Sequence, residues 1–395
     1  MNKAWVVGVG MIPFRKPGSS EAYDAMGAQA ARLALSDAGI DYRDVQQAYA
    51  GFVYGDSTSG QQALYGLGLT GIPIVNVNNA CATGSTALFL ARQAVQSGMV
   101  EVALALGFEQ MNPGALGVQS TDRPSIMGRQ LAKAHEAVAW RDDVPVAALL
   151  FGGAGEEHQR LHGTKPETFA RISVKARQHA ARNPLALFRD AVSLDDVMGS
   201  KTIYGPLTRL QCCPPTCGAA AAVIVSESYA RRRGLTDRAV EIAGQAMTTD
   251  PEATLEGASM VRVVGFEMGR NAANQVYEQT GIGPKDVDVC ELHDCFTTNE
   301  LLTYEALGFA PVGEGERFVM DGDNTYGGQV VTNPSGGLLS KGHPLGATGL
   351  AQCAELTWQL RGQADARQVD GARVALQHNL GLGGACVVTM YVKAA

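Results

Sequence analysis

The stretch His-Asp-Cys-Phe at 293–296 places an imidazole, a carboxylate and a thiol in three consecutive residues, directly after a short apolar run. A second cysteine, Cys81, lies where a predicted strand turns into a helix. A second histidine, His343, lies in the glycine-rich run NPSGGLLSKGHPLGATG. Two thiols and two imidazoles can supply both a nucleophile and groups that shuttle protons. These residue types therefore point to covalent acyl chemistry.

Cys81 follows the apolar stretch IPIVNVNN and precedes the helical pattern TGSTALFLARQAVQSG. A thiol at a helix N-terminus experiences the positive end of the helix dipole and unpaired N–H groups, and both favour the thiolate. The alternative is an inert buried cysteine, which is common in α/β cores. The polar residues Asn78 and Asn79 and the small residues Ala80 and Ala82 favour the functional interpretation.

His343 lies between Gly342 and Pro344 in a loop that opens a predicted helix. Small residues on both sides would let a substrate approach closely. The imidazole could accept the proton of Cys81, or donate to a developing oxyanion. The alternative is a loop histidine that only caps or packs.

His293 and Cys295 would share one face of a strand. The cysteine could act as a general acid or base, because an unperturbed thiol has a pKa of about 8.5. Two alternatives are a helix-capping turn before TTNELLTYEALG and a metal site. We expect no metal, because the other clustered cysteines lack paired C-x-x-C spacing. These cysteines are Cys212, Cys213 and Cys217.

A glycine-rich turn follows His378 and Asn379 and contains Gly381, Gly383 and Gly384. Such a turn can present backbone N–H groups to an oxyanion. The alternative is a tight turn ahead of the last strand. Gly381 is therefore a candidate oxyanion-hole residue.

Composition narrows the functional classes. The chain has 395 residues with 46% hydrophobic and 18% charged content, so it can bury a large core in two or three domains or a duplicated one. The net charge is -7 without a basic block, so nucleic acid is not an expected partner. Without a run of about 20 apolar residues, no membrane span is expected. Eight cysteines without a secretory leader or an SKL-type tail predict a cytoplasmic protein.

Apolar strand patterns alternate with alanine-rich helical patterns, which predicts an α/β fold. Strands are expected at 4–9, 73–77 and 100–106. Helices are expected at 24–38 and 84–96, each ending near a glycine.

An internal repeat indicates two similar α/β halves, because three pairs of segments occur in the same order. Superposing the halves places Cys81 opposite Gly346. Two equivalent strand–turn–helix corners would then face each other and bring Cys81 close to His343. The paired segments are 38–51 with 280–293, 80–88 with 345–353, and 210–225 with 376–391.

The stretch between the second and third repeated segments is roughly 99 residues longer in the first half than in the second half. We assign residues 1–110 and 206–265 to the N-terminal half, and residues 266–395 to the C-terminal half. Residues 111–205 are expected to form an inserted loop-rich subdomain, where substrate selectivity often resides.

The motifs NNACATGS, HDCF and GHP together resemble thiolases of the sterol-carrier-protein-X, or nonspecific lipid-transfer protein, type. The resemblance runs almost end to end through GDSTSGQQALY, LQCCPPTCGAAAA, ELHDCFTTNELLTYEALG and LQHNLGLGGA. It implies the thiolase fold, with two βαβαβαββ halves in a five-layer αβαβα arrangement and an inserted loop domain. It also implies a homodimer or a dimer of dimers.

The resemblance also implies roles for the candidate residues. Cys81 would be the nucleophile that carries the acyl group, and His343 would activate it and help to bind the thioester oxygen. His293 takes the position where other thiolases carry asparagine, and Cys295 would be the acid/base thiol. The amides of Cys81 and Gly381 would form a second oxyanion hole.

Asn333, Gly342 and Asn379 are implied substrate-binding residues. Many thiolases take their second cysteine from a C-x-G motif, and Asn379 stands at that position, so the thiol has moved to Cys295. No permanently bound cofactor is implied. Coenzyme A would be a substrate, and acyl-CoA and CoA would be the small-molecule partners.

The implied activity is thiolytic cleavage of 3-oxoacyl-CoA, or the reverse Claisen condensation. The alternatives are a retro-aldolase and a non-catalytic acyl-CoA-binding partner subunit of the same fold. Relatives with retro-aldolase activity replace key histidines with tyrosine, whereas His293 and His343 are both present. The segment RPSIMGRQLAKAHEAVAWRDD and Cys217, at a position of expected aspartate, depart from the family pattern.

Overall fold

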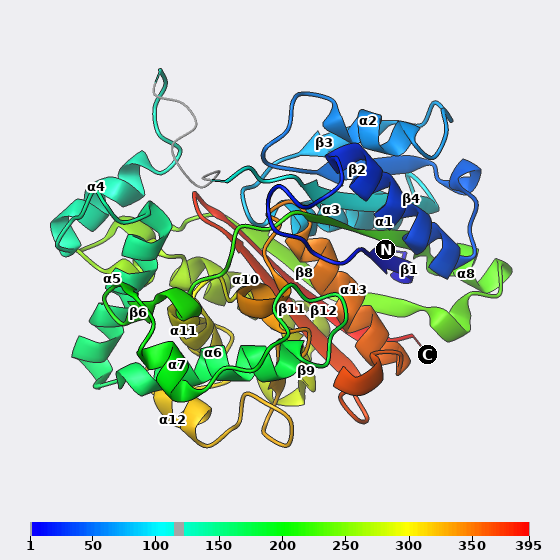
Figure 1. Ribbon diagram of the computed structural model, residues 1–395. Helices are drawn as coiled ribbons and strands as arrows, with labels where there is room; N and C mark the ends of the chain where they lie inside the picture. The colour runs from blue at the N-terminus through cyan, green and yellow to red at the C-terminus, as the bar shows by residue number, and fades with distance from the viewer. Residues whose placement is uncertain (1, 114–121, 395) are drawn as a thin grey trace.

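Two sets of five strands, joined edge to edge, form a ten-stranded mixed sheet at the centre of the computed structural model (Figure 1), which describes residues 2–113 and 122–394. The strand order is β3-β2-β4-β7-β1-β8-β12-β11-β9-β10. The first set comprises β1 (Ala4–Met11), β2 (Gln47–Gly51), β3 (Ile74–Val77), β4 (Val102–Glu109) and β7 (Gly218–Ser226). The second set comprises β8 (Val240–Thr248), β9 (Val289–Glu291), β10 (Val331–Thr332), β11 (Val374–Gly381) and β12 (Ala385–Lys393).

The two sets share one pairing pattern. In the first set, β2 pairs in parallel with β3 and β4, while β7 pairs antiparallel with β4 and β1. In the second set, β9 pairs in parallel with β10 and β11, while β12 pairs antiparallel with β11 and β8. This correspondence confirms the two similar halves expected from the repeat. Because β8 pairs with β12 along its length, we propose that the halves divide before Val240 rather than at 265.

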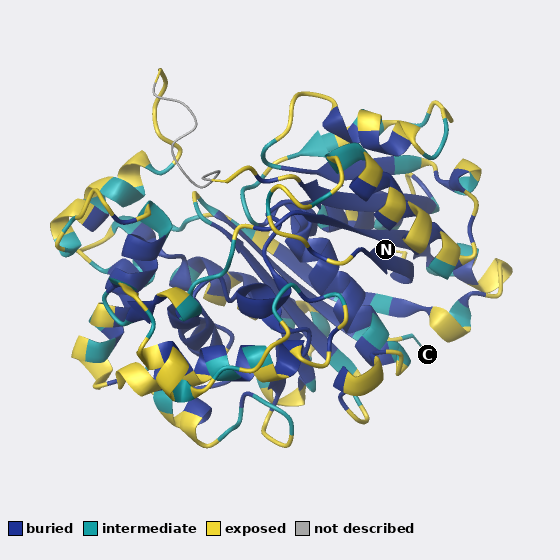
Figure 2. Ribbon diagram, in the orientation of Figure 1, coloured by how far each residue is buried: buried dark blue, intermediate teal, exposed yellow. Residues whose placement is uncertain are grey.

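Helices cover both faces of each set of strands, which gives the five layers expected for the thiolase fold. Two helices, packed against each other, lie between the sets. They are α3 (Thr83–Gln96) and α13 (Thr348–Arg361). The outer layers contain α1 (Tyr23–Ala38) and α2 (Ser59–Tyr65) on the first set, and α10 (Phe266–Thr280), with α11 (Thr297–Ala306) against it, on the second. The central helices and strands are the most buried part of the molecule (Figure 2).

The two central helices approach closely because the first turn of each contains a glycine. A Cβ at Gly84 would lie 2.7 Å from the carbonyl oxygen of Gly346. A Cβ at Gly349 would overlap the backbone amide of Ser85. Glycine at these positions therefore allows the two helix N-termini, which follow Cys81 and His343, to lie side by side.

Gly349→Ala should lower the free energy of unfolding by about 1–3 kcal/mol, because the added methyl group meets backbone that cannot move aside. Urea denaturation monitored by circular dichroism would measure this change. Gly128→Ala is the matched control, since Gly128 begins a helix and faces open space. Equal stability of the two variants would contradict the close packing of α3 and α13.

The inserted segment is more helical than expected. Its described part contains α4 (Gly128–Ala137), α5 (Val146–His162), α6 (Pro166–Ala180), α7 (Leu194–Met198) and β5 (Thr202–Tyr204), which pairs with β6 (Leu207–Thr208) just after the segment. Helices α4, α5 and α6 are stabilised because they pack against helices of the second half. Phe151 of α5 stacks on Phe296 with ring centroids 5.0 Å apart, and Lys175 of α6 makes a buried ion pair with Glu300.

The remaining α-helices are short and lie between the larger elements. They are α8 (Glu227–Arg232), α9 (Met260–Val263) and α12 (Gly315–Met320). Among the helices of residues 2–113 and 122–394, none has both the length and the apolar character needed to cross a bilayer.

Candidate active site

Cys81 lies in the turn between β3 and α3, where the backbone adopts an unusual conformation. Ala80 has a φ of 47°, a left-handed conformation that costs a non-glycine residue about 1–2 kcal/mol. The hydroxyl of Thr83 accepts the amide of Asn79 at 2.8 Å and donates to the carbonyl of Ala80. These bonds hold the half-buried thiol of Cys81 at the start of the helix.

Three of the predicted residues come together at this turn. The Cys81 Sγ and one ring nitrogen each of His293 and His343 all lie within 4.8 Å of one another. The two imidazole rings meet edge to face, with centroids 5.0 Å apart. The structure thus brings Cys81 and His343 together, as the superposed repeats predicted.

Hydrogen bonds fix the tautomer of His343. Its Nδ1 lies 2.7 Å from the hydroxyl oxygen of Thr348, and that hydroxyl donates to the carbonyl of Pro344 at 2.9 Å. Because the hydroxyl has one hydrogen, it must accept from Nδ1–H. The Nε2 atom is therefore left with a lone pair, and burial lowers the pKa of His343 to about 3. A neutral imidazole with a free lone pair is suited to accept the Cys81 proton.

A chain of hydrogen bonds fixes the opposite tautomer in His293. The Gln377 amide donates to the Ser85 hydroxyl at 2.8 Å, and this hydroxyl donates to the Asn379 carbonyl oxygen at 2.8 Å. The Asn379 nitrogen therefore faces Nδ1 of His293, at 3.1 Å, and donates to it. The proton of His293 must then be on Nε2, where it can stabilise an oxyanion. Burial and two neighbouring imidazoles hold the pKa of this histidine well below its ordinary value.

This hydrogen bonding does not fit a metal ion, although the three-residue group has metal-ligand chemistry. A metal ligand needs a lone pair on the nitrogen that faces the ion. The free nitrogen of His293 carries a proton instead, because Asn379 donates to the other one. The donor set matches a nucleophile, a base and a hydrogen-bond donor.

The Cys81 thiol is neutral in the resting protein. We expected the helix N-terminus to favour the thiolate, but burial raises the pKa of Cys81 to about 12, and the charge of Glu109 adds to this shift. The backbone amide of Cys81 lowers the pKa by a smaller amount. Proton removal by His343 is therefore required before the sulfur can act as a nucleophile.

Cys295 lies beside this group, and a third thiol lies opposite it. The amide of Cys213 donates to the carbonyl of Cys295 at 2.9 Å, next to an antiparallel bridge between Cys212 and Phe296. Burial, followed by Cys213 and Cys81, raises the pKa of Cys295 well above its ordinary value. Sequence reasoning missed Cys213 as a neighbour because the pairing of the two segments is not local.

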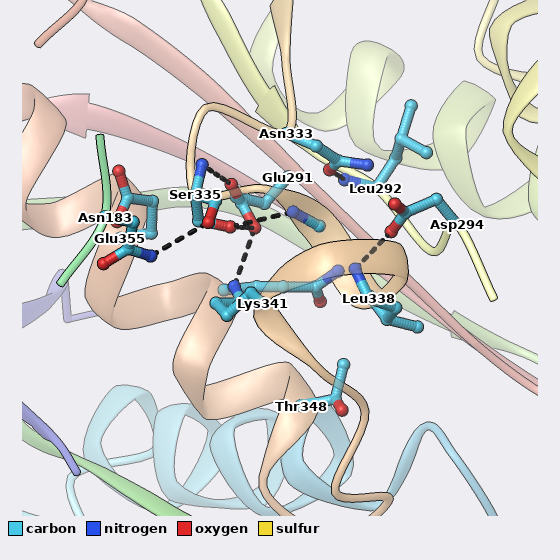
Figure 3. Close-up of polar contacts among 12 residues, drawn as sticks. Asn183, Glu291, Leu292, Asp294, Asn333, Ser335, Leu338, Lys341, Thr348 and Glu355 are labelled. Carbon is cyan, nitrogen blue, oxygen red and sulfur yellow. Dashed lines mark hydrogen bonds and ion pairs between the residues drawn. The ribbon is translucent and has the colours of Figure 1, made fainter. Parts of the chain in front are cut away.

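Asp294 of the HDCF motif has a structural role that the motif alone did not indicate. Its carboxylate accepts the amide of Leu338 at 2.7 Å (Figure 3). It also accepts the amide of Leu339 at 3.4 Å. These amides belong to the π-helical turn Gly337–Lys341, which leads directly to His343. Asp294 therefore positions the loop that carries the proposed base.

A buried ion pair holds the other end of this turn. The Nζ of Lys341 lies 3.0 Å from a carboxylate oxygen of Glu291, and both side chains are buried. The Ser335 hydroxyl donates to the same carboxylate at 2.7 Å, and Asn183 of the inserted segment donates to the Ser335 carbonyl at 2.9 Å (Figure 3). The loop before His343 is thus attached to β9 and to the insert.

Lys341→Met should destabilise the fold by about 3–5 kcal/mol, because it leaves the carboxylate of Glu291 buried without its partner. The measurement is the free energy of unfolding in urea. Lys133→Met is the control, since the exposed pair of Lys133 with Glu136 should contribute at most about 1 kcal/mol. A similar small loss in both variants would show that the buried pair does not support the loop.

Two predicted substrate-binding residues, Asn333 and Gly342, lie in the same loop. Asn333 is buried with a φ of 51°, and its side-chain oxygen accepts the amide of Leu292 at 2.8 Å. Its side-chain nitrogen has no hydrogen-bond partner among the described residues. Gly342 has a φ of 118°, and a Cβ there would lie 2.8 Å from the Thr216 methyl group. Their contact with substrate stays a prediction.

Gly381 lies against the Cys81 turn, as an oxyanion hole built from both amides requires. A Cβ at Gly381 would overlap the carbonyl of Asn79 and would lie 3.1 Å from the amide of Ala82. The end of β11 therefore packs on the turn without an intervening side chain. The oxyanion role of the Cys81 and Gly381 amides stays a prediction.

Protein-family models match both halves of the chain. The family model described as "Thiolase, N-terminal domain" matches residues 4–228. The model described as "Thiolase C-terminal domain-like" matches residues 252–392.

Similar proteins align along almost the whole chain. Sterol carrier protein 2 of Rattus norvegicus is 55% identical over 98% of this chain and 72% of its own length. Non-specific lipid-transfer protein-like 2 of Caenorhabditis elegans is 46% identical over 98% and 96% of the two chains. Benzoylsuccinyl-CoA thiolase subunit BbsB of Thauera aromatica is 37% identical over 96% and 95%.

Solved structures agree with the fold. The Ltp2-ChsH2(DUF35) aldolase superposes with a TM-score of 0.83 at 25% identity, covering 99% of this chain and 98% of that one. Human mitochondrial 3-ketoacyl-CoA thiolase superposes with a TM-score of 0.74 at 18% identity, covering 100% and 99%. The second similarity bears on the fold alone.

Proposed function

The chain belongs to the thiolase family, and on that basis we propose that it cleaves 3-oxoacyl-CoA with coenzyme A through an acyl group held on Cys81. The reverse Claisen condensation would use the same groups. The observation that carries the proposal is the convergence of Cys81 with two neutral imidazoles of opposite tautomer. One imidazole can take a proton from the thiol while the other donates to an oxyanion.

The first half-reaction transfers the acyl group to the enzyme. His343 accepts the thiol proton at Nε2, and the sulfur of Cys81 attacks the 3-oxo carbon. The C2–C3 bond then breaks, and its electron pair passes to the thioester as an enolate. Cys295 donates a proton to C2, which releases acetyl-CoA, or propionyl-CoA from a 2-methyl substrate, and leaves the acyl group on Cys81.

The second half-reaction returns the acyl group to coenzyme A. A proton passes from the CoA thiol to the Cys295 thiolate, and the CoA sulfur attacks the thioester carbonyl. The bond to Cys81 breaks, and the proton held by His343 returns to Cys81. The Nε2–H of His293 and the amides of Cys81 and Gly381 donate to the oxygens that become negative. Removal of one such donor typically costs about 3–4 kcal/mol of transition-state stabilisation.

Coenzyme A and acyl-CoA are the proposed small-molecule partners, with no permanently bound cofactor. We also propose a homodimer. Strand β3 lies at the edge of the sheet, and Val75 within it and the nearby Leu69 are exposed. An open strand edge with exposed apolar side chains favours pairing with another chain.

An assay for acetyl-CoA tests the proposal. The purified protein would be mixed with coenzyme A and either acetoacetyl-CoA or longer 3-oxoacyl-CoA, and the products would be separated by liquid chromatography. We expect CoA-dependent formation of acetyl-CoA and the shortened acyl-CoA. Binding of these substrates without turnover would instead support a non-catalytic acyl-CoA-binding subunit.

A retro-aldolase is the second candidate, because one of the similar structures is an aldolase. A retro-aldol reaction needs no acyl group on a cysteine and no CoA as acceptor. The thiol beside the lone pair of His343 supports thiolysis instead. Cleavage of a 3-hydroxyacyl-CoA to a carbonyl compound and a shorter acyl-CoA would favour the aldolase.

A further inference from the structure

Glu109, the last residue of β4, was not among the candidate residues of the sequence. Its side chain is buried, and its carboxylate accepts three backbone amides. The amide of Val53 lies 3.1 Å away, and those of Tyr54 and Gly346 lie 3.0 Å away. A buried carboxylate with three converging N–H donors is a built site and not an incidental contact.

The three donors come from two segments that lie far apart in the sequence. Val53 and Tyr54 belong to the loop after β2 in the first half. Gly346 belongs to the turn between His343 and α13 in the second half. This turn packs so tightly on β4 that a Cβ at Gly346 would overlap the carbonyl of Phe108. The carboxylate is therefore a fixed connection between the turn that follows His343 and the first half of the protein.

We propose that Glu109 is a positioning residue of the active site. It ties the turn after His343 to β4, and its negative charge adds to the burial that keeps the Cys81 thiol protonated in the resting protein. This inference goes beyond the proposed function and rests on it only in taking Cys81 as the nucleophile. A protonated thiol resists oxidation and alkylation, so the sulfur would become reactive only when His343 takes its proton.

The electrostatics agree with this geometry. Burial raises the pKa of Glu109 to about 7, although its three N–H donors act in the opposite direction. The Glu109 charge contributes to raising the pKa of both Cys81 and Tyr54 to about 12, and these are the titratable groups coupled to it. Glu109 therefore ionises before Cys81, and its charge then opposes ionisation of the thiol. The two groups titrate as a coupled pair.

The test is the pH dependence of Cys81 alkylation. Iodoacetamide labelling of Cys81 would be followed by peptide mass spectrometry from about pH 5.5 to about pH 9, in the wild-type protein and in Glu109→Gln. Labelling of the wild type should rise about tenfold per pH unit below pH 7 and bend to a smaller slope near pH 7, where Glu109 ionises. The variant should lack this bend, and its Cys81 should be labelled up to about tenfold faster at pH 8. The reason is that lowering the thiol pKa by about one unit raises the thiolate fraction about tenfold.

Glu101→Gln is the matched control, because it removes a carboxylate at the opposite end of β4, where Glu101 pairs with Arg232 on the surface. This control should label like the wild type. If Cys81 in Glu109→Gln is labelled at the wild-type rate and with the same bend, the proposal is overturned. This holds even if the variant melts at a lower temperature. Should that variant fail to fold, a wild-type profile without a bend near pH 7 would overturn it equally. Labelling needs no acyl-CoA, so its outcome is independent of whether the protein catalyses thiolysis.

Discussion

Cys81→Ala is expected to lower thiolysis of acetoacetyl-CoA by at least about 10⁴-fold, because the reaction loses the atom that carries the acyl group. The imidazoles of His293 and His343 would remain, but they cannot substitute for the sulfur as acyl carriers. The fold should be retained, since the thiol is only half-buried. The measurement is kcat/KM with acetoacetyl-CoA and coenzyme A, together with the thermal melting temperature.

Cys212→Ala is the matched control for this loss. Cys212 is also half-buried, but its thiol donates to the carbonyl of Thr208 and lies outside the group formed by Cys81 with the two imidazoles. It should keep nearly full activity. Thiolysis by Cys81→Ala at the rate of this control would remove Cys81 from the mechanism.

Cys295→Ser is the second change with a large expected effect. Loss of a general acid lowers the rate by about 10²–10⁴-fold, and a serine hydroxyl is a far weaker acid than a thiol. Steady-state turnover should fall by this factor, whereas a slow single-turnover acylation of Cys81 should remain detectable. Rapid quenching followed by mass spectrometry separates the two steps.

Cys213→Ser is the control, because Cys213 lies opposite Cys295 on the paired segment and has a similar apolar environment. It should change the rate by less than about tenfold, since it is not the proposed proton donor. If the two variants lose activity equally, the acid/base role cannot be assigned to Cys295. Full turnover by Cys295→Ser would contradict that role directly.

The duplicated fold could be predicted because its evidence is local and repeated. The helix expected at 24–38 is α1, and its end at Gly39 follows from the left-handed φ of 67° there. The superposed repeats also placed Cys81 near His343, since helices that follow equivalent strands meet at the local twofold axis. Family motifs added His293 to this pair.

The hydrogen-bond networks could not be predicted, because their members are ordinary polar residues in regular elements. Ser85 and Gln377 lie 292 positions apart, and they become neighbours only because α3 packs against α13, which in turn packs on β11. The same reason hid Glu109, whose partners lie in both halves. The protonation of Cys81 was predicted wrongly, because a helix N-terminus is visible in sequence whereas burial depends on what packs around the thiol.

The insert was expected to be loop-rich because it is rich in Arg, His and Pro and its apolar pattern is irregular. In α5, Gly152, Gly153 and Gly155 lie in the middle of the helix and are buried. They are tolerated because Tyr204, Val138 and Pro206, respectively, pack where their side chains would otherwise lie. Tertiary packing therefore overrides the low helix propensity of glycine.

The mass of the protein after brief mixing with a 3-oxoacyl-CoA in the absence of free coenzyme A tests the central claim most directly. The proposed mechanism predicts an increase equal to one acyl group, located on the peptide that contains Cys81, which disappears when coenzyme A is added. Cys81→Ala should show no such increase. Rapid CoA-dependent thiolysis by the wild type without an acyl group on Cys81 at any time would contradict the claim.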